Sequence, residues 1–319
     1  MGDVIHAMPM ISDIARAFPH ARIDWVVEEA FADLPRLHPA ITRVLPVALR
    51  RWRRRPLGID SWRELIAARR QMRRTRYHMV IDCQGLFKSA VLAYWARGPV
   101  TGFAARSARE PLAALLYQRT AMVDRGLHAV ERNRRLGAAA LGYALEGPEN
   151  FALAARAGQL RAEAPFDETG AVLLLSNASR ATKLWPDEHW IALEDELARR
   201  GHLCLLAWGS AAEREACERR AARMHSARVL PRASIAQIAA LAARAALVVG
   251  LDTGLSHLAA AVGAPTVGIY CDYDPRLAGL RASSPQGATR VASLGGVEQV
   301  PPVEEVIEAV DRVLAAPRA

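Results

Sequence analysis

The sequence predicts an α/β protein made of two doubly wound, largely parallel sheets. Short apolar runs alternate with helical patterns in both halves of the chain, which is typical of parallel sheets covered by helices on both faces. The alternation stops across residues 145–168, where Gly147, Pro148, Gly158 and Pro165 fall, and then starts again. With 319 residues, 51% of them hydrophobic, the chain is long enough for two domains, each with a substantial core. We expect the two domains to face a cleft.

The first half forms the predicted N-terminal domain, residues 1–150. Helical spacing of apolar residues predicts helices at Met1–Phe18, Ser61–Arg74, Leu86–Ala96 and Ala129–Leu141. The first of these ends before Pro19, because the residue ahead of a proline disfavours the helical conformation. Short apolar runs predict strands at Ile23–Val27, Thr42–Val47, Met79–Asp82 and Pro99–Phe103.

Residues 151–168 form the predicted linker, and residues 169–319 form the predicted C-terminal domain. Strands are expected at Ala171–Leu175, Leu203–Ala207, Arg228–Leu230, Leu247–Leu251 and Pro265–Tyr270. Helices are expected at Pro186–Arg199, Ala211–Met224, Ile235–Arg244, Leu255–Val262 and Pro302–Leu314. Pro186 in a first turn and Ser234 as an N-cap mark two of the helix starts. The last helix is a candidate for packing back on the N-terminal domain.

The composition excludes several classes of protein. No apolar run reaches the roughly 18 residues of a membrane span, and residues 1–6 lack the basic and apolar regions of a signal peptide. The high apolar content argues against disorder. The four cysteines are scattered and form no CxxC pair, so neither a zinc knuckle nor a disulfide framework is indicated. These features predict a reduced, cytoplasmic protein.

Positive charge is concentrated in one segment. The net charge is +9, and residues 50–76 hold eleven arginines against Asp60 and Glu64, a local excess equal to the whole net charge. An anionic partner (phosphate, nucleic acid or an anionic membrane surface) is one explanation, and a solvated helix face with compositional drift is the other. The arginines of residues 50–55, between Pro46 and Pro56, are too dense for one helix face. We therefore expect a functional connection there.

Residues 248–257 carry the most informative motif. A buried strand ends in Asp252-Thr253-Gly254, and a helix begins at once. Gly254 lets a ligand approach the backbone, and the helix start favours an anion such as a diphosphate. Asp252 at the strand end is suited to hold a sugar hydroxyl. An ordinary N-cap, in which Asp252 or Thr253 satisfies the first helical turn, is the alternative.

Two further loops follow strands of the second half. Ser179, Arg180, Thr182 and Lys183 lie between a strand and a helix. Lys183 is one of only two lysines in the chain, and a lysine there can neutralise phosphate as a point charge, although a solvated loop lysine is the alternative. Glu213 lies in the first turn of another helix, where it is suited either to bind ribose hydroxyls or only to complement the helix dipole.

Two acidic sites have two interpretations each. Asp3 lies at the start of the first helix, where a general base and a simple cap both fit. Asp272-Tyr273-Asp274 has the D-x-D pattern of metal-dependent sugar transferases. It leads into Pro275, which favours a turn over a metal site.

Segments spread over nearly the whole chain resemble, in order, the lipopolysaccharide heptosyltransferases of glycosyltransferase family nine. These segments are Met1–His6, Asp24–Glu29, Arg50–Arg53, Gln84–Ser89, Arg109–Leu112, His128–Arg132, Lys183–Pro186 and Asp252–His257. The last one is similar to the signature of the broad family. The second and third point to the enzyme that adds the first heptose rather than the second.

The resemblance implies a GT-B fold, in which an N-terminal Rossmann-like domain binds the acceptor and a C-terminal one binds the nucleotide sugar. It implies transfer of L-glycero-D-manno-heptose, with inversion, from ADP-heptose to the inner 3-deoxy-D-manno-octulosonic acid (Kdo) of Kdo2-lipid A. Such a protein is expected to be a monomer on the cytoplasmic face of the inner membrane. Neither a metal nor another cofactor is implied, and nucleic acid is not an expected partner.

The resemblance also implies a role for each candidate residue. Asp3 is the expected general base, and Lys183 is expected to neutralise the leaving diphosphate. The expected donor site is completed by Ser179, Arg180, Glu213, Asp252, Thr253, Gly254 and His257. The expected acceptor site consists of Arg50, Arg51, Arg53, Arg54, Lys88 and Arg109.

The beginning of the chain departs from the family pattern. Family members carry a strand and a small-residue loop ahead of the segment that is Met1-Gly2-Asp3 here. The resemblance therefore implies that the central first strand of the N-terminal sheet is missing from this sequence, which exposes two inner strand edges. A mis-assigned start codon is the preferred explanation.

Three other functions are consistent with the sequence. Another family-nine transferase with a different core acceptor shares the donor motifs. A basic nucleic-acid-binding protein accounts for the arginine-rich segment, although residues 50–55 contain a single aromatic, Trp52, and no binding motif is present. A catalytically inactive binding module follows from the missing strand.

Overall fold

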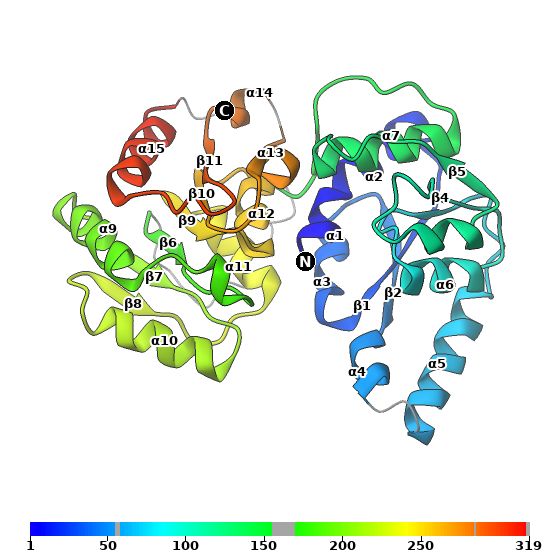
Figure 1. The fold of residues 1–319 in the computed structure, drawn as a ribbon, viewed down its shortest axis with the longest axis horizontal. Helices are drawn as coiled ribbons and strands as arrows, with labels where there is room; N and C mark the ends of the chain where they lie inside the picture. Colours follow the sequence, from blue (N-terminus) through cyan, green and yellow to red (C-terminus); the bar gives the residue numbers. More distant parts are fainter. Residues whose placement is uncertain (55–57, 155–169, 284, 317–319) are drawn as a thin grey trace. The chain divides into compact units, whose positions relative to one another are not determined.

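The computed structural model describes residues 1–54, 58–154, 170–283 and 285–316. The chain divides into two compact units (Figure 1): unit 1 comprises Met1–Ile5 with Pro148–Ala319, and unit 2 comprises His6–Gly147. The division lies close to the expected boundary at residue 150, but the first five residues group with the C-terminal unit. Most of the expected linker, residues 155–168, lies outside the described residues.

Unit 1 is built around one parallel sheet of six strands in the order β11-β10-β9-β6-β7-β8. The strands are β6 (Val172–Leu175), β7 (Cys204–Leu206), β8 (Ala227–Val229), β9 (Leu247–Leu251), β10 (Thr266–Tyr270) and β11 (Val291–Gly295). Every residue of β6, β9 and β10 is buried, which explains why these strands are continuous apolar runs without alternation. The strand order reverses direction between β6 and β9, as it does in doubly wound folds.

Helices cover both faces of this sheet. They are α9 (Asp187–Arg199), α10 (Ala211–Ala221), α11 (Ile235–Ala242), α12 (Gly254–Ala261) and α15 (Val303–Ala315), with the short elements η4 (Ala181–Lys183), α13 (Pro275–Ala278) and α14 (Pro285–Ala288). The α9 and α15 helices lie side by side in Figure 1 and share one apolar core with the strands. The α12 helix packs on β9, β10 and α11. The expected packing of α15 on the N-terminal domain stays a prediction.

Unit 2 is also an α/β layer structure, but its strands form two parallel sheets, β1-β2 and β3-β4-β5. The strands are β1 (Ile23–Glu28), β2 (Ile41–Val47), β3 (Val80–Asp82), β4 (Val100–Phe103) and β5 (Arg119–Ala121). Within the residues described for this unit, β1 pairs only with β2, and β3 pairs only with β4.

Helices flank the strands of unit 2 as well. They are α2 (Met8–Ala17), α3 (Asp33–Arg36), α4 (Leu49–Arg54), α5 (Ile59–Met72), α6 (Phe87–Trp95) and α7 (Ala129–Leu141), with η1 (Glu29–Phe31) and η2 (Pro111–Leu116). The helix α1 (Gly2–His6) precedes α2, and only its last residue belongs to unit 2. The α2 and α7 helices pack together, and α5 and α6 pack on β2 and β3.

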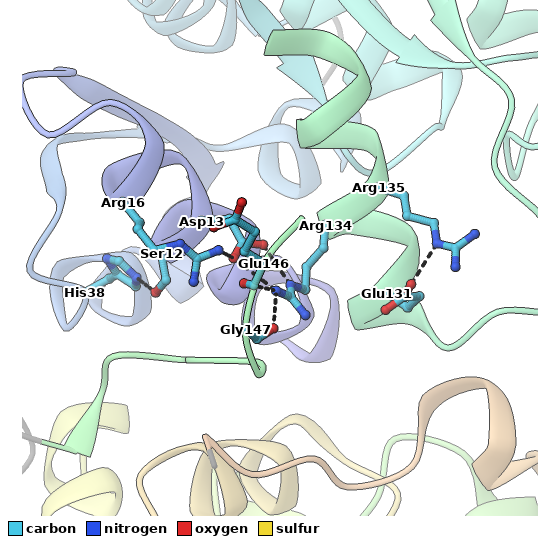
Figure 2. A network of polar contacts seen from close by, with 9 residues as sticks. All are labelled: Ser12, Asp13, Arg16, His38, Glu131, Arg134, Arg135, Glu146 and Gly147. Carbon is cyan, nitrogen blue, oxygen red and sulfur yellow. Dashed lines mark hydrogen bonds and ion pairs between the residues drawn. The ribbon is translucent and has the colours of Figure 1, made fainter. Parts of the chain in front are cut away.

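A buried ion pair joins α2 to α7. The guanidinium of Arg134 donates to both carboxylate oxygens of Asp13 at 2.7 and 3.1 Å (Figure 2), and both side chains are buried. Arg134 also donates to the carbonyls of Glu146 and Gly147, and Arg16 donates to Asp13 at 2.9 Å. The planar donor fork of arginine fits this arrangement, which fixes the end of unit 2 against its first long helix.

The structure confirms most of the expected elements and corrects three expectations. The long first helix is interrupted at Ala7 and is two helices, α1 and α2. The arginine-rich segment expected to be a connection contains the helix α4, because Trp52 is buried against Leu45 and Met72 and anchors it, and arginine is itself a good helix former. The sequence patterns did not reveal the edge strands β5 and β11, which are short or half-buried.

The structure also shows the state of the cysteines and whether any helix is suited to span a membrane. All four cysteines are free thiols, as the scattered spacing predicts. Among the described residues, no helix is both long enough and apolar enough to cross a membrane.

A buried histidine in unit 2 makes its stability depend on pH. His38 accepts the Ala40 N–H on Nδ1 at 3.2 Å, so its Nε2 carries the proton and donates to Ser12 Oγ at 3.0 Å (Figure 2). Burial lowers the pKa of His38 to about 4. Between this value and the ordinary 6.5, the unfolded chain binds more protons than the folded chain, so the free energy of unfolding falls as the pH falls.

We expect urea unfolding to show a loss of about 2 kcal/mol between pH 7.5 and pH 5 that His38→Gln does not show. The glutamine removes the titrating ring and keeps a donor for Ser12. His20→Gln, which changes an exposed histidine of the same unit, is the matched control and should retain the wild-type slope. An equal slope in the wild type and His38→Gln would contradict the assignment.

Candidate active site

The candidate donor site lies at the carboxyl edge of the unit 1 sheet. Loops that follow β6 and β9 flank the point where the strand order reverses, and ligands of doubly wound sheets bind in the crevice at this point. The loop after β6 leads to η4 and Lys183, and the loop after β9 holds Asp252 and Thr253 before α12. The sequence motifs therefore meet because β6 and β9 are neighbours in the sheet.

Lys183 and Asp252 form a direct ion pair. The Lys183 ammonium donates to Asp252 Oδ2 and, at 3.2 Å, to the Asp252 backbone carbonyl. His257 Nε2 lies 3.6 Å from the other carboxylate oxygen. The side chains of Lys183 and Asp252 are 16% and 11% exposed, so the two charges are mostly removed from water.

The partners of Asp252 keep its carboxylate ionised. Burial by itself raises the pKa of this carboxyl, but hydrogen bonds and positive charge from His257 and Lys183 outweigh burial, and the pKa lies below its ordinary value. An ionised, oriented carboxylate is a strong acceptor for sugar hydroxyls. The same carboxylate orients the Lys183 ammonium, and 16% of that side chain remains exposed.

A third loop, after β10, closes around Lys183. Asp272 accepts a hydrogen bond from Thr182 at 2.6 Å and lies 3.6 Å from the Arg180 guanidinium. The Tyr273 ring centroid lies 5.9 Å from the Lys183 nitrogen, within the range of a cation–π contact. Sequence reasoning included Thr182 in the candidate loop but missed Asp272 and Tyr273 as partners of the site, although they follow a strand beside β9.

The acidic triplet after β10 is occupied by protein contacts. Asp274 caps α13 by accepting the Arg276 N–H at 2.9 Å, and its carboxylate pairs with the Arg276 guanidinium. The segment is a bend that leads into the capped start of α13. In the described part of the chain, no group of His, Cys, Asp and Glu side chains is arranged to hold a metal ion.

A buried arginine fixes the loop that carries Lys183. Arg220 on α10 donates to Ser176 Oγ at 3.2 Å and to Asn177 Oδ1 at 3.3 Å, both at the end of β6. Its Nε donates to Asp187 at 2.6 Å, at the start of α9. The side chain of Arg220 is 5% exposed. The loop after β6 is therefore held at both ends, which favours a defined position for Lys183.

The start of α12 lacks a side-chain cap from Thr253. Thr253 is the N-cap residue but makes no side-chain cap hydrogen bond, so the first N–H groups of this helix are not satisfied by a cap. Two glycines are required by close approach: a Cβ on Gly250 would overlap Ser256 Oγ, and one on Gly254 would overlap the Met1 side chain. Of the expected alternative, in which Asp252 or Thr253 satisfies the first turn, the structure contradicts a side-chain cap by Thr253.

The contact between Met1 and Gly254 places the first residues beside the donor motif. Asp3 lies in the first turn of α1 and is part of unit 1. The backbone carbonyl of Met1 accepts the N–H groups of Val4 and Ile5 at 3.0 and 3.3 Å. The structure thus places Asp3, the expected general base, in the same unit as Lys183 and Asp252, although these two residues are far from Asp3 in the sequence.

Two of the expected donor residues have other surroundings. Glu213 Oε2 accepts the N–H groups of Gly209 and Ser210 at 2.7 and 3.0 Å, and Ser210 Oγ accepts the Glu213 N–H, which is a capping box. Among the described residues, Glu213 Oε1 accepts no hydrogen bond. Ser179 is exposed in the bend before η4.

The expected acceptor arginines belong to α4 in unit 2. Arg51 pairs with Glu29 at 3.0 Å and with Glu64 at 2.8 Å, and Arg50 stacks over the Phe31 ring. Arg53 and Arg54 are exposed and pair with no acid in the described residues. The two arginines after Trp52 are thus better placed than Arg51 to bind an external anion.

The segments around Lys88 and Arg109 are joined through Glu110. The Glu110 N–H donates to the Gly85 carbonyl at 3.0 Å, and the Glu110 carboxylate accepts the Phe87 N–H at 2.7 Å, at the start of α6. Gly85 has φ +65°, and a Cβ there would lie 3.4 Å from the Arg109 nitrogen. Both cationic residues are exposed, Lys88 in the first turn of α6 and Arg109 in the loop before η2.

Comparisons with known proteins show the relatives of this chain. The family described as "Glycosyltransferase family 9 (heptosyltransferase)" matches residues 65–295. The chain is 44% identical to "Lipopolysaccharide heptosyltransferase 1" of Pseudomonas aeruginosa over 88% of this chain and 78% of that protein. It is 41% identical to the protein of the same name of Escherichia coli strain K12, over 88% and 87%.

A solved structure is similar over almost its entire length. The structure titled "E. coli heptosyltransferase WaaC with ADP" superposes with a TM-score of 0.89 and 36% identity, covering 98% of this chain and 97% of that one. A second, titled "E. coli heptosyltransferase WaaC with ADP-2-deoxy-2-fluoro heptose", has a TM-score of 0.84 and 35% identity, covering 98% and 96%. The chain belongs to glycosyltransferase family 9, the heptosyltransferase family.

Proposed function

We propose that this enzyme transfers L-glycero-D-manno-heptose from ADP-heptose to the inner Kdo of Kdo2-lipid A. The observation that carries the proposal is the Lys183–Asp252 pair at the strand-order reversal of unit 1. It joins a cation for a diphosphate to a carboxylate for a sugar. The solved relatives with ADP and with an ADP-heptose analogue support a donor of this class.

The proposed donor pose uses groups that are already oriented. The diphosphate meets the Lys183 ammonium and the uncapped N–H groups at Thr253 and Gly254. Asp252 accepts a heptose hydroxyl, with His257 behind it. Glu213 keeps its capping bonds through Oε2 and offers Oε1 to the ribose. Lysine and helix dipole supply the charge stabilisation, so the reaction needs no metal.

The proposed chemistry is one in-line displacement. The acceptor hydroxyl oxygen forms a bond to the anomeric carbon while the bond from that carbon to the ADP oxygen breaks, which inverts the configuration. Asp3 takes the hydroxyl proton. The negative charge that develops on ADP is stabilised by Lys183 and the start of α12. The bond that forms to the anomeric carbon replaces the one that breaks, and the reaction needs no reactant besides the donor and the acceptor.

The proposed acceptor contacts come from unit 2. Arg53, Arg54, Lys88 and Arg109 bind phosphate and carboxylate groups of the lipid A core, and Arg50 and Arg51 line the same helix. Arg51 has to exchange part of its pairing with Glu29 or Glu64. We propose that the enzyme works as a monomer on the cytoplasmic face of the inner membrane, in which the lipid acceptor is embedded.

Release of ADP, measured with ADP-heptose and Kdo2-lipid A, tests the function directly. We expect release that depends on both substrates, with the heptosylated lipid identified by mass spectrometry. A core acceptor that already carries the first heptose is the matched control and should support little release. Preferential use of that control would assign a different family-nine reaction, and ADP release without acceptor would indicate hydrolysis only.

A further inference from the structure

The outer face of α5 carries an exposed apolar stripe. Ile59, Trp62 and Ile66 are 71%, 55% and 45% exposed. Their spacing of three and four residues places them on one side of the helix. Large apolar side chains that line up on an exposed face indicate a surface that meets a partner.

The same face becomes strongly basic toward the end of the helix. The exposed arginines are Arg63, Arg69, Arg70, Arg73 and Arg74. Arg63 lies 3.7 Å from Asp60, and the other four form no ion pair with any residue that the structure describes. Uncompensated positive charge of this density attracts an anionic surface.

The opposite face of α5 packs in the core of unit 2. Leu65, Ala68 and Met72 pack in the core of unit 2, with Leu45 and Trp52 from neighbouring segments. Figure 1 shows α5 at the edge of unit 2, beside α4 and α6, and these helices contact it. The exposed apolar stripe is therefore not a by-product of core packing.

We infer that the outer face of α5 is a docking surface for an anionic lipid bilayer. A helix of 14 residues with an apolar stripe, a tryptophan and flanking arginines matches the elements that lie in the plane of a membrane interface. The apolar side chains insert between headgroups, and the arginines bind lipid phosphates. A nucleic acid would contact the arginines but would leave Ile59 and Ile66 in water, so it accounts for the basic residues of this face and not for the apolar ones.

This inference rests on the proposed function in one respect: a lipid acceptor gives the enzyme a reason to reside at a membrane. The surface is separate from the residues assigned to the donor and the acceptor. Docking through α5 holds the enzyme at the surface in which its acceptor is embedded, and thereby raises the local concentration of acceptor.

Sedimentation of the full chain with vesicles tests the surface. The vesicles contain phosphatidylglycerol and phosphatidylethanolamine, without any acceptor. We expect Arg69→Glu with Arg70→Glu to weaken binding at least about 20-fold, because each arginine near an anionic surface contributes about 1 kcal/mol. Ile59→Ser with Ile66→Ser should weaken it about tenfold. Neutral phosphatidylcholine vesicles should bind the wild type poorly.

Matched controls separate the surface from net charge and from misfolding. Arg219→Glu with Arg312→Glu makes the same charge change at exposed arginines of α10 and α15 that form no ion pair with a described residue, and it should bind vesicles within twofold of the wild type. Trp62→Phe preserves the packing and should abolish most of the quenching of tryptophan fluorescence by brominated acyl chains. Equal losses in the Arg219/Arg312 control, or unchanged quenching in Trp62→Phe, would overturn the inference.

Failure of the inference and failure of the proposed function give different results. Heptose transfer to a de-acylated, water-soluble acceptor reports the reaction alone and should be equal in the Arg69/Arg70 variant and the wild type. A wild type that transfers heptose but does not bind vesicles refutes the surface and keeps the function. Vesicle binding without transfer refutes the function and keeps the surface. Tight, salt-dependent RNA binding without vesicle binding refutes the surface in favour of nucleic acid.

Discussion

Replacing Lys183 with methionine is expected to lower kcat/KM for heptose transfer by at least about 10³-fold. The substitution removes the cation that meets the leaving diphosphate. It also leaves Asp252 mostly buried without the partner that holds its pKa below the ordinary value. Loss of one member of such a pair costs about 3 kcal/mol of stability.

A double variant separates the two effects of Lys183→Met. Adding Asp252→Asn removes the unpaired carboxylate, so thermal stability should return most of the way to that of the wild type. Activity should stay low, because the phosphate-binding cation and the carboxylate proposed to bind the heptose are both missing. Recovery of activity in the double variant would show that Lys183 acts only by neutralising Asp252. Lys183→Arg preserves the charge but changes its geometry, and an intermediate rate is expected.

Replacing Asp3 with asparagine is expected to lower kcat by about 10³-fold or more while donor affinity stays within twofold. A general base acts on the acceptor hydroxyl and has little part in holding ADP. Single-turnover rates and calorimetric binding of ADP measure the two quantities separately. Loss of ADP binding would place Asp3 in the donor site and remove it as the base.

The pH profile gives an independent readout of Asp3. A general base must be ionised, so kcat/KM of the wild type should fall on the acid side as the carboxyl takes up its proton. In Asp3→Asn this acid limb should disappear, and Asp3→Glu should restore part of the rate and the limb. An acid limb of the same shape in Asp3→Asn would assign the titration to another group. Asp13→Asn cannot serve as a control, because Asp13 supports the buried contact with Arg134.

Much of the fold was predictable because the signals are local. The fully buried strands β6, β9 and β10 appear as continuous apolar runs, and α7 agrees with its expected range at both ends. Ser234 caps α11 by accepting the Gln237 N–H, as its position predicts. The edge strand β5 was missed because three residues with two exposed positions have no clear pattern, and β11 was missed because its five residues are all half-buried and do not alternate.

The candidate site was predictable only in part. The motifs at Lys183 and Asp252 follow strands, and parallel strands bring their carboxyl ends to one edge, so a shared site could be expected. The particular side-chain pairs could not be predicted from the sequence. Glu213 illustrates the difference, because the same first-turn position suits a ribose contact or a capping box, and in the structure its Oε2 is used by the cap.

The sequence by itself determined the alternation of strands and helices and the family, because apolar periodicity and motif spacing are properties of neighbouring residues. The tertiary structure alone decided the pairing of Lys183 with Asp252, the burial of Trp52 that makes a helix of the arginine-rich segment, and the grouping of Met1 with Gly254. It also decided which face of α5 is exposed. These features depend on contacts between segments far apart in the chain, and the local sequence does not specify which distant side chain will be the partner.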